Sequence, residues 1–178
     1  MGFIIVGGNT LAFAEYEDVT DRDQRLFEAN EGIANAGQIE DFTERATTKI
    51  LYLIKDTDWW KNYYLSQSGS TLGGLNPYQT VTGRIDVPPP DANKFLLRRQ
   101  DWTDVCVYMT LYEYVLPKIA DFSNEDNAEY KKIGFYREKF DKLFAQLIEA
   151  GDWYDWDGTG TIVNSEKAPT VLNLVRRR

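Results

Sequence analysis

A short acidic segment, residues 155–166, carries oxygen-bearing side chains at the spacing of a calcium-binding loop. Calcium is a hard cation that takes six to eight oxygen ligands, and a twelve-residue EF-hand loop supplies them around a glycine at its sixth position. Asp155 and Asp157 stand at the first and third positions of the segment, and Glu166 stands at the twelfth. Gly160 occupies the sixth position. The predicted metal ligands are Asp155, Asp157, Thr159, Thr161 (through its backbone carbonyl) and Glu166.

Three features of the same segment favour a simpler interpretation. The fifth position holds Thr159, which is a weaker ligand than Asp or Asn. The helix predicted before the segment ends at Gly151, too early for an EF-hand, and Ala168-Pro169 offers no exiting helix. The alternative is an Asp/Gly turn that links the last helix to an extended segment. Calcium is the one cofactor for which the sequence gives an argument, and both interpretations stay open.

The other reactive side chains of the sequence exclude several kinds of enzyme. The chain has no histidine, which removes Ser-His-Asp and Cys-His catalysis and the zinc sites that need an imidazole. Its single cysteine, Cys106, lies on the predicted apolar face that holds Trp102 and Met109, where we expect a buried structural thiol. A glycoside hydrolase that uses carboxylates alone stays an alternative, although most of the 28 acidic residues are better explained as helix caps, charge pairs and solvated faces. No catalytic residue is predicted.

The composition predicts one folded, acidic domain. The chain has 178 residues, of which 14% are aromatic, and disordered chains are poor in aromatic residues. The formal net charge is −8, so an acidic surface is a poor match to nucleic-acid phosphates. No apolar run approaches the roughly 18 residues of a membrane span, and the N-terminal residues lack the basic region of a signal peptide. We expect a protein that is made in the cytoplasm and does not contact a membrane.

Periodic apolar residues predict a mainly α fold with a helical bundle as its core. Apolar side chains recur at steps of three and four through residues 38–55, which is the period of a helix. Thr57 is expected to cap a short aromatic helix over residues 58–64. The pairs Trp59-Trp60 and Tyr63-Tyr64 in that helix are more typical of a core or a subunit interface than of a base- or sugar-stacking site.

Two longer helices complete the predicted bundle. Asp91 is expected to cap the longest helix, which Pro117 ends or kinks because its ring clashes with the carbonyl of the preceding turn. The final helix covers residues 126–150. Gly151 follows it and is expected to end it in the left-handed conformation that glycine adopts without strain.

Three segments flank or interrupt this core. Residues 1–19 begin apolar and Gly-rich and then turn acidic, and we expect an N-terminal arm that a neighbouring molecule must order. Residues 20–160 form the helical domain, with an inserted loop at 66–90 that is rich in Ser, Gly and Pro. Residues 81–87 of that loop can form one arm of a β-hairpin. Residues 161–178 form an extended C-terminal tail.

The loop and the tail hold the residues predicted to contact partners. An alternating apolar segment followed by three arginines can add as a strand to a neighbouring protein and place its charges on an acidic surface. A purely solubilising terminus is an equal alternative. The candidate tail contacts are Val171, Leu172, Leu174, Val175, Arg176, Arg177 and Arg178, and the candidate loop contacts are Leu72, Leu75, Tyr78, Val81, Arg84 and Ile85.

The order of these elements resembles the head-to-tail adaptor proteins of tailed bacteriophages, which are also called head completion, neck or connector proteins. The resemblance covers roughly residues 38–160 and rests on pattern and order of elements. The inserted segment 61–87 is longer than that pattern needs, and the turn after Gly151 is not a general feature of the family. The segments that carry the resemblance are 87–91, 102–108, 112–114, 136–140 and 147–151.

The resemblance implies a structural protein of the virion and not an enzyme. Members of the family assemble as a ring of roughly twelve copies beneath the portal and extend the channel through which DNA passes as cargo. Their C-terminal tails dock onto the portal protein, and their loops meet a neighbouring subunit or the next neck or tail component. The corresponding parts of this chain are the tail contacts and the loop contacts named above. An acidic calcium-binding interaction module is the alternative function.

Overall fold

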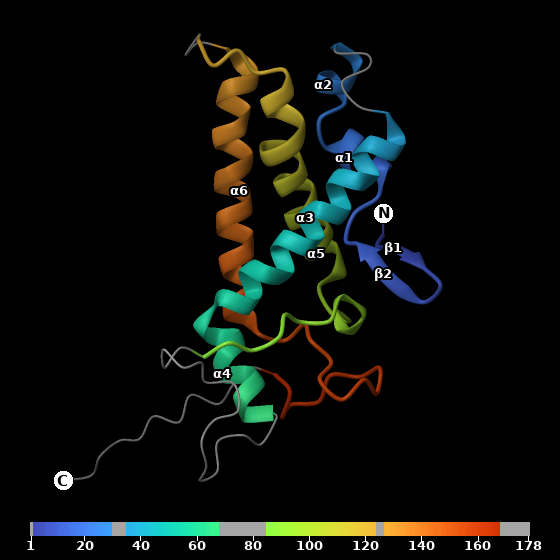
Figure 1. Ribbon diagram of the computed structural model, residues 1–178, viewed down its shortest axis with the longest axis vertical. Coiled ribbons are helices and arrows are strands. Elements are labelled where there is room, and N and C mark those ends of the chain that lie inside the picture. Colours follow the sequence, from blue (N-terminus) through green and yellow to red (C-terminus); the bar gives the residue numbers. More distant parts are fainter. Residues whose placement is uncertain (1, 30–34, 68–84, 124–126, 168–178) are drawn as a thin grey trace, which may run out of the picture.

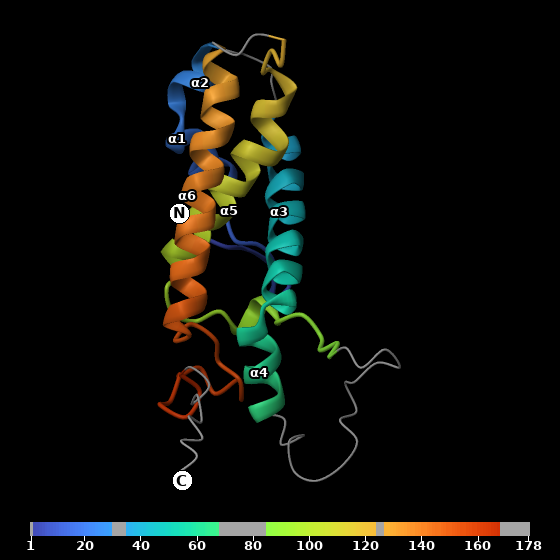
Figure 2. The ribbon, with the colours of Figure 1, turned by 90° about the vertical axis from the view of Figure 1, so that its left-hand side faces the viewer.

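The computed structural model describes residues 2–29, 35–67, 85–123 and 127–167. Its elements are the strands β1 (Ile4–Val6) and β2 (Asn9–Ala12) and the helices α1 (Tyr16–Arg22), α2 (Gln24–Ala29), α3 (Ala36–Asp56), α4 (Asp58–Gln67), α5 (Arg99–Met109) and α6 (Ala128–Ala150). The predicted mainly helical fold class is confirmed. The helix α5 packs against both α3 and α6 along the length of the molecule, and α4 extends beyond one end of α3 (Figures 1 and 2).

None of the helices in the described ranges has the length and apolar character that crossing a membrane requires.

The predicted helix over residues 38–55 is confirmed as α3, which begins two residues earlier. Asn35 caps it, because the Asn35 side chain accepts a hydrogen bond from the backbone N–H of Gln38 while the Gln38 side chain accepts one from Asn35. Thr57 separates α3 from α4, and its hydroxyl accepts a hydrogen bond from the backbone N–H of Trp60 at 3.1 Å. The predicted cap of the aromatic helix is therefore also confirmed.

The helix that was expected to follow Asp91 begins later than predicted. Asp91 caps only a 3-10 turn, Ala92–Lys94, through a hydrogen bond from the backbone N–H of Asn93 at 2.9 Å. The chain then turns at Arg98, whose φ of 54° is left-handed, and α5 starts at Arg99. The predicted cap was wrong because an Asp turn and a helix start share the same local hydrogen bond.

Pro117 lies at the end of the helical run that starts with α5, as expected. The helix passes into a wider π-helical stretch, Thr110–Val115, and then into a 3-10 turn, Leu116–Lys118. Proline has no N–H to donate, so the regular hydrogen-bond ladder cannot continue through it. The longest helix is α6 and not the helix before Pro117. Gly151, with a φ of 57°, ends α6 in the predicted left-handed conformation.

The N-terminal segment is part of the core, which corrects the expectation that residues 1–19 need a neighbouring molecule. β1 and β2 pair in antiparallel fashion around Gly7 and Gly8, both of which have a positive φ. Phe13 follows β2 and is completely buried. Its N–H donates to the Thr47 hydroxyl at 2.9 Å, and its carbonyl accepts from the Thr103 hydroxyl at 2.7 Å. Burial of this ring and pairing of both backbone groups hold the segment in place within one chain.

Aromatic side chains fill the centre of the molecule. Trp60, Tyr63, Trp102 and Trp153 are all buried, which confirms that the aromatic helix contributes to the core. The Trp102 and Trp153 rings meet edge to face at 4.8 Å between centroids, an arrangement that aromatic pairs favour. Cys106 is also buried, and burial raises the pKa of its thiol to about 11. The predicted structural thiol is confirmed, because such a thiol stays protonated at neutral pH.

Candidate functional site

The predicted metal-binding segment begins where the chain leaves α6 and crosses to α4 (Figure 1). Its approach is fixed by an antiparallel bridge between Phe95 and Tyr154. The N–H of Asp155 donates to the carbonyl of Lys94 at 2.9 Å, and the Trp153 indole donates to the carbonyl of Leu147 at 2.8 Å. These contacts make the first residue of the segment a rigid part of the fold.

Three predicted ligands converge in space. Asp155, Asp157 and Glu166 each offer one carboxylate oxygen, and these oxygens lie within 4.8 Å of one another. Asp155 and Glu166 are only 3% and 5% exposed, whereas Asp157 faces solvent. Like charges at this separation repel by about 1 kcal/mol even in bulk water and by more in a buried site, so the group needs compensating positive charge or donors.

Backbone N–H groups supply part of that compensation. Asp155 accepts from Gly158 at 2.9 Å and from Gly160 at 2.8 Å. Both glycines have a positive φ, 73° and 81°, which turns these amides toward the carboxylate. Glu166 accepts from Trp156 at 2.8 Å and from Val163 at 2.9 Å. These hydrogen bonds hold both carboxylates in fixed orientations.

The exposed carboxylate and the two threonines lie on the outer side of the loop. The hydroxyl and backbone N–H of Thr159 hold the pKa of Asp157 below its ordinary value. The Thr159 hydroxyl also donates to the backbone carbonyl of Thr161 at 3.2 Å. The oxygens predicted at positions five and seven of the loop are therefore neighbours. The structure thus groups the five predicted ligands as three converging carboxylates and one adjacent pair of oxygens.

The loop closes differently from an EF-hand and differently from the predicted extended segment. Residues 164–167 form a turn, in which the N–H of Glu166 donates to the carbonyl of Val163 at 3.0 Å. No strand forms at 161–163, and residues 168–178 of the predicted tail lie outside the described residues. Glu166 accepts hydrogen bonds from the backbone amides of residues 156, 157 and 163, which holds this part of the chain against the loop.

Tyr63 is a neighbour of the loop that the sequence did not indicate. It lies on α4 and is 0% exposed, and its ring meets the Trp156 ring edge to face at 5.8 Å. Its hydroxyl has no hydrogen-bond partner among the described residues. Burial raises the pKa of Tyr63, and the charges of Glu166, Asp155 and Asp157 raise it further. Such contacts, made across almost a hundred positions of sequence, leave no local signal.

The other predicted contact residues lie almost entirely outside the described residues. Of the loop contacts, only Ile85 is described, and it is half-buried against the core of its own chain. The remaining loop contacts, Leu72, Leu75, Tyr78, Val81 and Arg84, and the seven tail contacts at 171–178 fall outside the described ranges. The proposed β-hairpin arm at 81–87 is described only from residue 85 onward.

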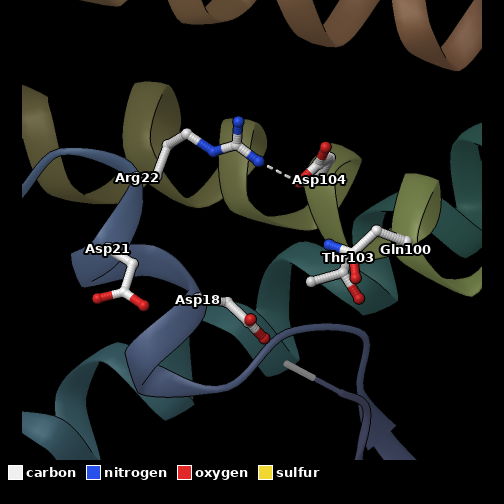
Figure 3. Close-up of a pocket in the computed structure, with 6 residues that line it drawn as sticks. All are labelled: Asp18, Asp21, Arg22, Gln100, Thr103 and Asp104. Atoms are coloured by element: carbon white, nitrogen blue, oxygen red, sulfur yellow. Dashed lines mark hydrogen bonds and ion pairs between the residues drawn. The ribbon is translucent and has the colours of Figure 1, made fainter.

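A polar cleft of about 340 Å³ lies between α1 and α5, apart from the acidic loop (Figure 3). Asp18 lies in it and is buried, with one carboxylate oxygen accepting from the backbone N–H of Glu15 at 3.0 Å. Arg22 and Asp104 form an ion pair at its side. These contacts cap α1 and tie it to α5, so each has a structural role. The full lining is Asp18, Asp21, Arg22, Gln100, Thr103 and Asp104.

Comparisons of the chain with protein-family models, with curated proteins and with solved structures found no match.

Proposed function

We propose that this protein is a structural adaptor of a bacteriophage virion, which assembles as a ring beneath the portal and connects the capsid to the tail. The observation that carries the proposal is a hydrogen bond of 3.0 Å from the Gln67 side chain to the carbonyl of Ser165. Gln67 is the last described residue before the central loop, and Ser165 lies two residues before the last described residue, Lys167. The two segments predicted to bind partners therefore leave the core at neighbouring points.

The core between these segments has the form that a connector needs. A buried aromatic centre and three packed helices make a stiff body, and α4 lies at the opposite end from the start of α6 (Figure 1). The region around that start exposes Phe122, Tyr130 and Phe135, whose exposed fractions are 62%, 43% and 52%. Exposed aromatic side chains favour protein interfaces, so this end of the body offers a contact surface in addition to the end from which the two predicted partner-binding segments leave.

The charge distribution fits the same role. The chain has a formal net charge of −8, while its last three residues are all arginine. An acidic ring repels the phosphates of passing DNA, which lowers the affinity of the channel wall for its cargo. A basic end is suited to an acidic surface on the portal protein, with the apolar residues before it adding contact area.

The docking role of the tail is tested by binding to the portal protein encoded in the same genome. We expect the full chain to bind assembled portal and a variant that ends at residue 167 to lose that binding. A variant with Arg176, Arg177 and Arg178 changed to lysine is the matched control, because it keeps the charge, and we expect it to retain most of the affinity. Undiminished binding by the truncated chain would refute the docking role.

A further inference from the structure

We propose that residues 155–166 bind one calcium ion, held by the carboxylates of Asp155, Asp157 and Glu166 with oxygens of Thr159 and Thr161 as further ligands. This site goes beyond the adaptor role and does not depend on it. The segment matches the EF-hand spacing at positions one, three, six and twelve. The fold brings the three carboxylates together, although neither flanking helix of an EF-hand is present around the loop in the described residues.

The backbone donors leave coordination sites open on Asp155 and on Oε2 of Glu166, whereas Oε1 of Glu166 already accepts from both Trp156 and Asp157. The two oxygens of Asp155 each accept one backbone hydrogen bond, from Gly158 and Gly160. A carboxylate oxygen has two lone pairs, so each retains one for a cation. The hydrogen bond from the Gly160 N–H also holds the Asp155 carboxylate in a fixed orientation at the sharp turn of the loop. Because N–H dipoles only partly offset three converging charges, a divalent cation would remove the remaining repulsion.

Tyr63 gives a second observation, independent of the acidic cluster. Its hydroxyl is buried without a hydrogen-bond partner among the described residues, and its ring meets that of Trp156, the second residue of the loop, at 5.8 Å between centroids. A buried polar group without a partner costs free energy, so native proteins usually pair it with protein or with ordered water. Five protein ligands leave at least one calcium position for water, and such a water could pair with the Tyr63 hydroxyl.

The chemistry of the ligands selects calcium over other metals. All five donors are oxygens, and the loop offers no nitrogen or sulfur ligand of the kind that zinc and copper prefer. Magnesium demands a near-ideal octahedron and keeps several of its waters, whereas calcium tolerates the irregular wrap of a flexible loop. Since Thr159 replaces the usual acidic residue at position five, we expect affinity at the weak end of the range for such loops.

Terbium luminescence on the full chain tests the site, because Tb³⁺ binds as Ca²⁺ does and emits when nearby tryptophan absorbs light. Trp156 is the second residue of the loop, and its backbone N–H donates to the Glu166 carboxylate at 2.8 Å. We expect chelator-treated protein to sensitise Tb³⁺ emission and calcium to displace the ion, with magnesium needing at least tenfold higher concentration. Calcium should also raise the unfolding temperature.

Three variants separate a real site from a general effect of charge. Asp157→Asn should weaken binding at least tenfold without changing the unfolding temperature in chelator, because this side chain is exposed. Thr159→Asp should tighten binding several-fold, an outcome that misfolding cannot produce. Asn164→Asp adds the same charge at position ten, which supplies no ligand, and should change affinity less than threefold.

Equal gains from Thr159→Asp and Asn164→Asp would overturn the site, as would wild-type protein that neither sensitises Tb³⁺ nor gains thermal stability in calcium. The test uses the isolated chain, so its failure would leave portal docking standing, and failed docking would leave the calcium site standing.

Discussion

Single residues carry much of the strain and pairing that shape this molecule, and Arg98 is the clearest example. It is the one non-glycine residue with a positive φ among those described. Its guanidinium pairs with Asp152 through two hydrogen bonds, at 2.5 Å from Nε and 3.0 Å from Nη2. A left-handed conformation costs a non-glycine residue about 1–2 kcal/mol. The two hydrogen bonds to Asp152 offset that cost, and they tie the start of α5 to the chain that follows α6.

The pair should stabilise the fold only when Asp152 is ionised. The hydrogen bond from Arg98 holds the pKa of Asp152 below its ordinary value. A folded-state pKa below the unfolded value contributes stability above the unfolded pKa, which is about 3.9, and that contribution disappears as pH falls through the folded pKa. We therefore expect Asp152→Asn to lower the unfolding temperature at pH 6 and to have little effect near pH 2.

Asp101→Asn is the matched control for that experiment, because Asp101 lies farther from the same guanidinium, at 3.8 Å. Thermal unfolding at both pH values measures the difference. An Asp152→Asn effect that persists unchanged near pH 2 would show that the stability comes from packing and not from the ion pair.

Two glycines of α6 and its cap should respond to alanine in opposite directions. Gly151 has a φ of 57°, so Gly151→Ala should destabilise the protein by about 1 kcal/mol. Gly134 lies within α6, and an added Cβ there would meet nothing within 4 Å. Gly134→Ala should stabilise the protein by about 0.5–1 kcal/mol, since alanine loses less backbone entropy in a helix. Denaturant unfolding of both variants measures the two signs, and a shared sign would contradict the assigned roles.

At the scale of elements, the N-terminal hairpin belongs to the core through the two backbone groups of Phe13. Thr103 donates to its carbonyl and Thr47 accepts from its N–H. Thr103→Val and Thr47→Val keep the shape but leave one buried group unpaired, so each should cost about 1–3 kcal/mol. Urea denaturation measures the loss. Thr48→Val is the control and should change stability little, because Thr48 lies beside Thr47 on α3 but is exposed. Wild-type stability of both buried variants would mean that the hairpin is not integral to the fold.

Sequence patterns predicted the elements whose signals are local. α3 and α6 follow the helical period, and Gly151 and Pro117 act through their own backbone chemistry. The start of α5 was missed because the left-handed turn at Arg98 depends on Asp152, far along the chain. The N-terminal hairpin was missed because its strands are short and its Gly7-Gly8 turn was not recognised as a hairpin signal.

The candidate site shows the same division. The spacing of residues 155–166 predicted that the acidic side chains would converge, because a tight loop brings them together whatever the rest of the fold does. By contrast, the contacts of α4 with the loop depend on tertiary packing. These contacts are made by Tyr63 with Trp156 and by Gln67 with Ser165. No local pattern in the sequence could indicate which helix would cover the loop.

At the scale of the whole molecule, the protein is a stiff helical body, and the segments predicted to bind partners leave it at one end. The hydrogen bond between Gln67 and Ser165 joins the points from which the central loop and the C-terminal tail depart. Exposed aromatic residues lie near the other end, around the start of α6. Contact surfaces at both ends are what the proposed adaptor role requires, and calcium bound at the proposed site would stiffen the end from which the tail departs.

Electron microscopy of assembled portal mixed with the full chain tests this central claim most directly. We predict an added layer of density on the portal, with the rotational symmetry of the portal and roughly twelve copies of the chain. The same mixture with the chain that ends at residue 167 should show portal alone. Bare portal particles in the presence of excess full-length chain would contradict the adaptor function.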